Sequence, residues 1–223
     1  MLNAKNINRE TAERLGCIMS TLLGLKYLFY LIYHPFDGFW DLKHEKRGNS
    51  QISFILIILL LLTMILRRQV TGFIFNNNTP ESINFFSETF NVLVPFFLWC
   101  IANYAISTLT DGKGTFIDVV MVTAYALTPI IILNLPMLIL SNVIVFDERA
   151  IYDVLGGISL VWSGLLLLIG MKTIHQFEMF RTVIFILATV LGMAVIAFLS
   201  ILFLSLVQQM YNFALLIYLE LSL

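Results

Sequence analysis

Residues 182–219 read TVIFILATVLGMAVIAFLSILFLSLVQQMYNFALLIYL and contain no charged side chain. This run is the longest of five such stretches. The others are Gly48–Leu66, Thr89–Thr110, Val119–Phe146 and Val154–Met171. A bilayer core about 30 Å thick needs about 20 apolar helical residues to span it. Each run is long enough, or nearly so, and none alternates as the strands of a membrane barrel do. The sequence therefore predicts an all-α fold, a polytopic membrane helical bundle with five transmembrane helices.

The composition excludes several classes of protein. Of the 223 residues, 59% are hydrophobic and 12% are charged, whereas soluble domains carry about 25% charged residues. The five runs leave no stretch of about 50 residues for a soluble ATPase, kinase or sensor domain. The sequence shows no broad basic face for nucleic acid, and its two cysteines do not indicate a disulfide framework.

The apolar segment before the first run differs from the other five. Arg14–Phe36 carries Lys26 near its middle, and a lysine at the bilayer centre costs about 2.5 to 3.5 kcal/mol. We therefore expect an N-terminal interfacial helix with tyrosines at the level of the lipid headgroups. A sixth span is the alternative. Pro35 should end this helix, and a charged elbow follows before the first span.

The chain is thus expected to have three parts. Residues 1–50 form a cytoplasmic segment with the interfacial helix and the elbow. Residues 51–210 form the five-helix domain, and residues 211–223 form a short extracytoplasmic tail. Within the third span, Pro129 and Pro136 each remove a backbone hydrogen bond, so we expect the helix to kink or break there.

Basic residues are distributed unevenly about the spans. Ten lie on the side of the N-terminus: seven before the first span, Lys113 between spans two and three, and Lys172 and Arg181 between spans four and five. Three lie on the opposite side. Because lysine and arginine accumulate on the cytoplasmic side, we expect a multi-pass protein of the plasma membrane. Its N-terminus should be cytoplasmic and its C-terminus outside.

Three sets of residues are candidates for contacts with other helices or with lipid. Polar side chains in spans two and three could line a conduction path, although such groups more often bond neighbouring helices. They include Asn103, Tyr125, Thr128 and Asn134. Small residues in spans four and five favour close helix packing and form a candidate partner interface. They are Ser159, Ser163, Gly164, Ala188 and Gly192. Basic residues of the elbow are expected to contact lipid phosphates. They are Lys43, Lys46 and Arg47.

The residues give little support to catalysis. Asp41, His44 and Glu45 would share a helical face, and His175 and Glu178 lie three residues apart. The first set could hold a divalent ion, but a solvated elbow whose basic residues contact lipid phosphates is the favoured interpretation. The second set lacks the ligands from several helices that a carboxylate-bridged site needs. No ionisable residue lies deep in a span, and no nucleophile has a base in plausible reach. We therefore expect a protein that is not an enzyme and that has no catalytic residue, no cofactor and no metal.

Several stretches resemble the Yip1 family of membrane proteins. They are HPFDGFWDLKHEKRG (residues 34–48), WCIAN (99–103) leading to DGKG (111–114), YALTP (125–129) and HQ (175–176). The resemblance covers nearly the whole chain and is closest to members from Gram-positive bacteria. It implies five spans with a cytoplasmic N-terminus and supplies no catalytic residue. Eukaryotic members bind small GTPases in vesicle traffic, but this chain lacks the long acidic or proline-rich N-terminal region typical of them. Bacterial relatives are often encoded beside permeases of carbohydrate ABC importers.

Two functional hypotheses follow from these observations. The first is a non-catalytic membrane scaffold or accessory subunit that binds other integral membrane proteins, with ABC permease subunits as the partners that the resemblance implies. The alternative is a small transporter or channel, with the proline-broken third span lining the path. The lack of buried charge and of internal repeats favours the first hypothesis. Stoichiometric partners on purification from native membranes would favour the scaffold, and a lone homo-oligomer would favour the transporter.

Overall fold

The computed structural model describes residues 24, 26–45, 50–72, 85–144 and 148–221, and every regular element in these ranges is helical. The helices are α2 (Pro35–His44), α3 (Ser50–Val70), α4 (Phe85–Leu109), α5 (Phe116–Ala126), α6 (Thr128–Leu140), α7 (Arg149–His175) and α8 (Met179–Leu221). Five segments are long and apolar enough to cross a membrane: α3, α4, α5 together with α6, α7, and α8. The predicted all-α fold with five candidate spans is confirmed.

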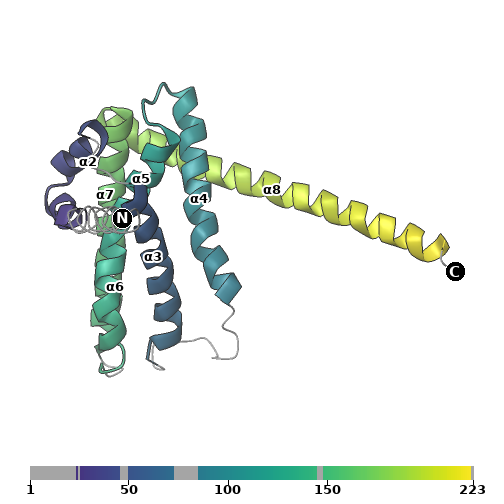
Figure 1. Cartoon of the computed structure of the whole chain (residues 1–223), viewed down its shortest axis with the longest axis horizontal. Helices are drawn as coiled ribbons and strands as arrows, with labels where there is room; N and C mark the ends of the chain where they lie inside the picture. Colours follow the sequence, from purple (N-terminus) through teal and green to yellow (C-terminus); the bar gives the residue numbers. More distant parts are fainter. Residues whose placement is uncertain (1–23, 25, 46–49, 73–84, 145–147, 222–223) are drawn as a thin grey trace, which may run out of the picture.

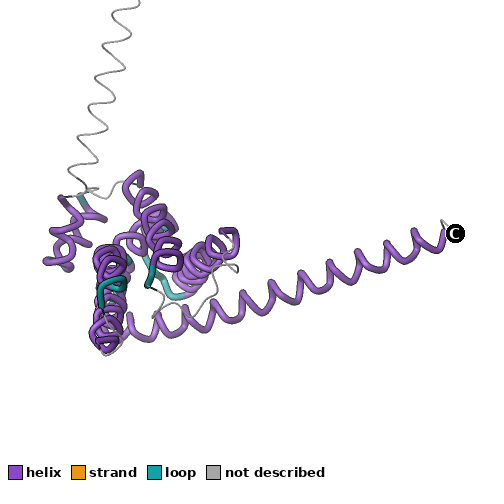
Figure 2. Tube along the Cα trace, turned by 90° about the horizontal axis from the view of Figure 1, so that it is seen from below, coloured by secondary structure: helices purple, strands orange, loops and turns teal. Residues whose placement is uncertain are grey.

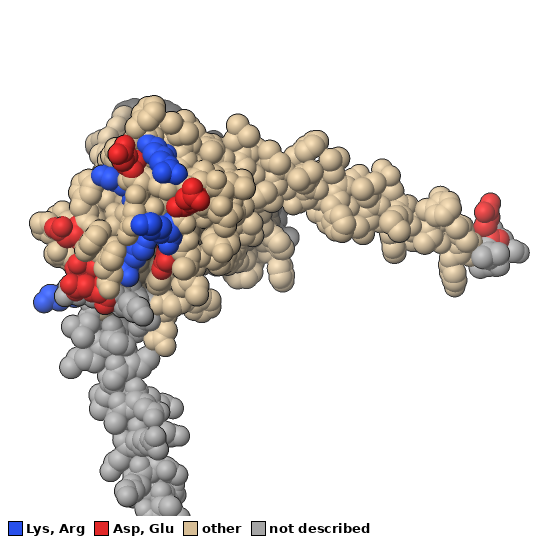
Figure 3. All heavy atoms as spheres, turned by 90° about the horizontal axis from the view of Figure 1, so that it is seen from above, with Lys and Arg blue, Asp and Glu red and all other residues tan. Residues whose placement is uncertain are grey.

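Four of these segments run side by side as a bundle (Figure 1). α3 packs against α4, α5 and α6, and α7 packs against α5 and α6. α2 lies beside α7 at one end of the bundle, which we call the α2 end (Figure 1). Charged side chains gather on the face seen from this end (Figure 3). The α2 end therefore has the character of a surface that meets water or lipid headgroups.

The third apolar run forms two helices instead of one. α6 begins at Thr128, directly before Pro129, which has no N–H for the carbonyl of Tyr125. Thr128 donates its hydroxyl to that carbonyl over 2.7 Å, so a side chain replaces the lost backbone bond. The break expected at Pro129 is present. Pro136 lies inside α6 without ending it, so the run is divided at only one of the two prolines.

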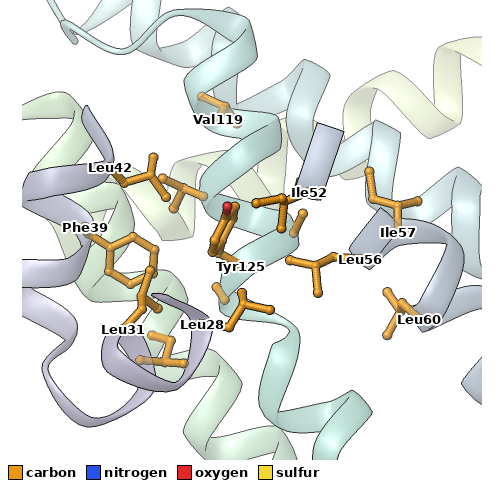
Figure 4. Close-up of a cluster of buried hydrophobic side chains, with 14 of the residues drawn as sticks. Leu28, Leu31, Phe39, Leu42, Ile52, Leu56, Ile57, Leu60, Val119 and Tyr125 are labelled. Atoms are coloured by element: carbon orange, nitrogen blue, oxygen red, sulfur yellow. The ribbon is translucent and has the colours of Figure 1, made fainter. Parts of the chain in front are cut away.

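The buried side chains of the core gather where α2, α3 and α5 meet (Figure 4). Tyr125 of α5 is fully buried at the centre. Phe39 and Leu42 approach it from α2, and Ile52 and Leu56 approach it from α3 (Figure 4). Packing of this kind holds α2 onto the spans, because the many small van der Waals attractions between closely packed side chains add up.

Two glycines permit the close approach of α2. A Cβ added at Gly170 of α7 would lie 2.4 Å from Val122 of α5 and 3.1 Å from the Phe39 ring of α2. A Cβ added at Gly38 of α2 would lie 2.9 Å from the Cα of Leu31. These distances are too short for ordinary van der Waals contact, so a side chain at either position would force the neighbouring segments apart.

The start of the described chain packs on α2. Residues 26–33 are helical, with Leu28 and Leu31 buried and Lys26 exposed. The Tyr27 hydroxyl donates to the carbonyl oxygen of Gly38. The rest of the predicted interfacial segment lies outside the described residues. The choice between an interfacial helix and a sixth span therefore stays a prediction.

α8 differs most from expectation. The sequence predicts that the five-helix domain ends at residue 210 and that residues 211–223 form a tail, whereas α8 is one helix from Met179 to Leu221. The helix continues past residue 210 because no glycine or proline follows Gly192 to end it. The point at which the chain leaves the membrane stays a prediction. α8 packs on α4 near its start and then leaves the bundle across the direction of the other spans (Figures 1 and 2).

Candidate functional site: a polar cluster around His175

A buried histidine lies at the α2 end of the bundle. His175 is the last residue of α7 and is 1% exposed. Its Nε2 lies 3.1 Å from Oδ1 of Asn103 on α4, and the backbone N–H of Gly114 donates to its Nδ1 over 3.4 Å. Because a backbone N–H can only donate, Nδ1 must accept, and Nε2 must carry the proton that is donated to Asn103. The imidazole in this arrangement is neutral.

Aromatic rings enclose the histidine on its other sides. The ring of Phe177 stacks on the imidazole with centroids 5.5 Å apart, and the Phe185 ring of α8 lies 4.8 Å away. The imidazole therefore ties α4, α7 and α8 together at a single point. We call His175, Asn103 and residues 111–114 the His175 cluster.

The loop between α4 and α5 must be rich in glycine because it passes so close to the imidazole. A Cβ added at Gly112 would lie 2.7 Å from His175 Nδ1, and one added at Gly114 would lie 2.9 Å from Cε1. Asp111 adopts a positive φ of 57°, which turns the chain directly after α4. α5 then begins with a capping box, in which Thr115 and Asp118 bond each other's backbone N–H groups.

Basic side chains bind the carbonyl groups around the cluster. Lys113 donates to Oε1 of Gln176 over 2.9 Å, and Arg181 donates to the carbonyl of Thr110 over 2.5 Å. Arg181 also lies over the Phe177 ring at 4.5 Å. Gln176 ends α7 in the left-handed conformation, with φ at 57°. The Arg181 bond satisfies a backbone carbonyl directly after α4, and both basic side chains place positive charge near the negative end of a helix dipole.

Lys43 requires a correction to the predicted lipid contacts. Its ammonium group donates to the carbonyl of Ile174, in the last turn of α7, and is therefore engaged by the protein. Burial lowers the pKa of Lys43 below its usual range. Asp118 opposes this shift, and Lys113 adds to it. The same bond fastens α2 to α7. Lys46 and Arg47, the other predicted phosphate contacts, lie outside the described residues.

The polar residues predicted in the spans are used mainly within the fold. Asn103 belongs to the His175 cluster, and Thr128 bonds the carbonyl of Tyr125. The Tyr125 ring meets the edge of Tyr27 with centroids 6.3 Å apart. Asn134 donates its side-chain N–H to the carbonyl of Ile130 over 2.7 Å. Three of the four predicted residues thus lie at the α2 end or at the helix break beside it, and Asn134 lies apart from them.

The small residues of spans four and five fall into two sets. Ser159 and Ser163 of α7 are buried within the bundle. Ala188 is partly buried, and a Cβ added at Gly192 would lie 2.9 Å from Ile106 on α4, so Gly192 serves the packing of α8 on α4. Gly164 differs, because a Cβ added there meets nothing within 4 Å. Of the five, only Gly164 presents an open notch on the surface.

The His175 cluster was not predicted as a unit. His175 was considered as a metal ligand with Glu178, but the structure pairs it with Asn103 and Gly114. Within the described residues, no group of three or more His, Cys, Asp or Glu side chains could hold a metal ion. The order of the spans could have indicated this cluster. The connection between α4 and α5 and the connection between α7 and α8 lie on the same side of the membrane, which brings residues 111–114 close to His175.

Comparison with known proteins places the chain in context. Residues 29–217 match the family model of the Yip1 domain. Neither the curated proteins nor the solved structures gave a match. Three of the stretches that resemble the family meet at one imidazole, because Asn103 and Gly114 both contact His175. Lys43, from a fourth stretch, contacts Ile174 directly before that histidine.

The bond between Asn103 and His175 predicts a non-additive pair of substitutions. Asn103→Leu or His175→Phe alone leaves a buried polar partner unsatisfied, which should lower the free energy of unfolding by about 1–3 kcal/mol. The double variant should lose less than the sum of the two, because both polar groups are then absent. Thermal unfolding in one detergent measures this. Ser163→Ala is the control, since the buried Ser163 hydroxyl has no partner among the described residues. Strict additivity would contradict the interaction.

Proposed function

Because the chain belongs to the Yip1 family, whose domain matches residues 29–217, we propose that it is a non-catalytic membrane scaffold or accessory subunit of a larger membrane complex. The proposed partners are other integral membrane proteins. The main observation behind this proposal is the outward face of α7, where glycines with open space beside them alternate with large apolar side chains.

The outward face of α7 has the form that favours helix docking in lipid. A Cβ added at Gly157 or at Gly164 meets nothing within 4 Å. Leu160 and Val161 between them are 68% and 62% exposed. Positions three, four and seven residues apart share one side of a helix. Glycines on such a face let a second helix approach closely enough for extensive van der Waals contact, which is a main source of helix association in membranes.

α8 adds a second surface for neighbours. Residues 201–220 are exposed on all sides, and only Glu220 among them is charged. A helix that is apolar all round must lie in lipid or against other apolar helices. Its length beyond the α4 contact therefore offers area to a neighbouring membrane protein. The leading candidates for such a neighbour are permease subunits of a carbohydrate ABC importer, and this choice rests on the family resemblance alone.

The proposed location is the plasma membrane, with the α2 end facing the cytoplasm and the C-terminus outside. Support comes from the excess of basic residues on that side and from the charged side chains that gather there (Figure 3). Fusion of a reporter that is active only outside the cytoplasm should give signal after Arg149 and none after Lys113. The reverse pattern would overturn the orientation.

Partner binding should depend on the size of the side chain at residue 164. We expect Gly164→Leu to reduce the amount of partner that co-purifies from native membranes severalfold, because the larger side chain separates the helices. Gly164→Ala is the matched control and should retain the partner. Neither variant should unfold the protein, because the site is open and both residues favour helix over glycine.

Two outcomes would count against the scaffold. If the unmodified protein purifies without a partner, in several detergents and at native expression level, this result would contradict the accessory-subunit proposal and favour a transporter or channel. Retention of the partner by Gly164→Leu would show that this face of α7 is not the interface.

A further inference from the structure

A cavity of about 250 Å³ lies between α3, α6 and α7, at the end of the bundle away from α2. Its walls include Arg67 of α3, Asn134 of α6, and Asp153 and Gly157 of α7. Leu160, which also lines it, is 68% exposed, so the cavity opens sideways onto the surface that meets lipid. None of these residues belongs to the His175 cluster.

The cavity contains a buried hydrogen-bond acceptor without a donor. Asn134 is 1% exposed. Its side-chain N–H group donates to the carbonyl of Ile130, but its Oδ1 has no hydrogen-bond partner among the described residues. An unsatisfied buried carbonyl oxygen is costly, and native structures rarely leave one. A ligand with a hydroxyl group would satisfy it at lower desolvation cost than a ligand with a buried ammonium group.

The charges around the cavity favour an anion. Asp153 pairs with Arg149, with Nε and Oδ2 3.6 Å apart. Arg67 is half-buried and pairs with no carboxylate in the described part of the chain. The charged side chains that line the cavity are Arg67 and Asp153. Because Asp153 already pairs with Arg149, which lies outside the lining, Arg67 is the lining charge that can bind an anion. Arginine presents a planar fork of donors that matches phosphate oxygens.

The depths of these groups fit a single ligand. Arg67 lies in the last turn of α3, and Asp153 lies near the start of α7. Both are therefore at the level of the bilayer interface. Asn134 is about two turns before the end of α6, and thus lies roughly 9 Å deeper. The anion site is consequently at the mouth, and the site for a hydroxyl donor is inside.

We propose that this cavity binds an anionic phosphate that carries a free hydroxyl group, of the glycerol phosphate class. Arg67 binds the phosphate, and Oδ1 of Asn134 accepts a hydrogen bond from the hydroxyl. The same chemistry is supplied by the headgroup of phosphatidylglycerol and by free glycerol 3-phosphate. The sideways opening past Leu160 allows the acyl chains of a lipid to remain in the bilayer.

The test uses the full chain in nanodiscs or detergent micelles, with bound lipid counted by native mass spectrometry. Phosphatidylglycerol is compared with phosphatidylmethanol, which has the same charge and no hydroxyl, and with phosphatidylcholine. We expect one tightly held phosphatidylglycerol, bound about tenfold or more above phosphatidylmethanol, because a buried hydrogen bond is lost with the latter. Equal binding of these two lipids would overturn the proposal and leave a cavity filled by water.

Variants separate the two halves of the site. Asn134→Leu should lower phosphatidylglycerol binding to the level of phosphatidylmethanol, and Arg67→Gln should weaken both lipids. Gly157→Leu should block the cavity without loss of folding, because a Cβ there meets nothing within 4 Å. Ala150→Leu is the control, since it places the same side chain at an exposed position of α7 that lies outside the cavity and outside the partner face. Unchanged binding in Gly157→Leu would contradict the assignment even if Asn134→Leu failed to fold.

Titration of the delipidated protein with free glycerol 3-phosphate identifies the source of the ligand. Competition by the free compound at a concentration near its cellular level would indicate a soluble ligand. Binding of phosphatidylglycerol without such competition would indicate the lipid headgroup. If the cavity does not bind this ligand, the scaffold proposal still stands, because that proposal is tested by partner recovery and by the variants at residue 164.

Discussion

The α2 end depends on the burial of one neutral imidazole, that of His175, between Asn103 and the backbone of Gly114. The imidazole has two polar atoms and no access to water, so each needs a partner of the right kind. α4 supplies the acceptor, and the loop before α5 supplies the donor. That loop can reach the ring only because residues 112 and 114 have no side chain. One hydrogen-bonding requirement thus fixes the relative positions of α4, α5 and α7.

The rest of the α2 end is built around this fixed point. Lys43 binds α2 to the last turn of α7, and Phe39 fits against Gly170. Phe39 also belongs to the core that surrounds Tyr125 (Figure 4). The opposite side of the molecule has a different character, because the outward face of α7 and residues 201–220 of α8 are largely exposed apolar surface. A rigid end joined to open apolar helix surfaces suits a protein that positions other membrane proteins, as we propose.

The spans could be predicted from sequence because apolar length is decided by the bilayer and needs no knowledge of packing. The break at Pro129 was predictable for a similar local reason, the missing N–H. The end of α8 was not, since a long apolar helix without glycine or proline gives no signal for where it leaves the membrane. Contacts of Lys43 and His175 were missed because they join positions far apart in the chain. Nothing in their local sequence distinguishes an inward lysine or histidine from a solvated one.

The protonation state of His175 tests the central claim most directly. Nitrogen-15 NMR of the labelled protein in lipid at neutral pH distinguishes the two neutral tautomers from the charged ring. The account predicts a single neutral form with the proton on Nε2, in slow exchange with water, and the loss of that signal in Asn103→Leu. A charged or rapidly exchanging imidazole, or a proton on Nδ1, would contradict the arrangement that holds the α2 end together.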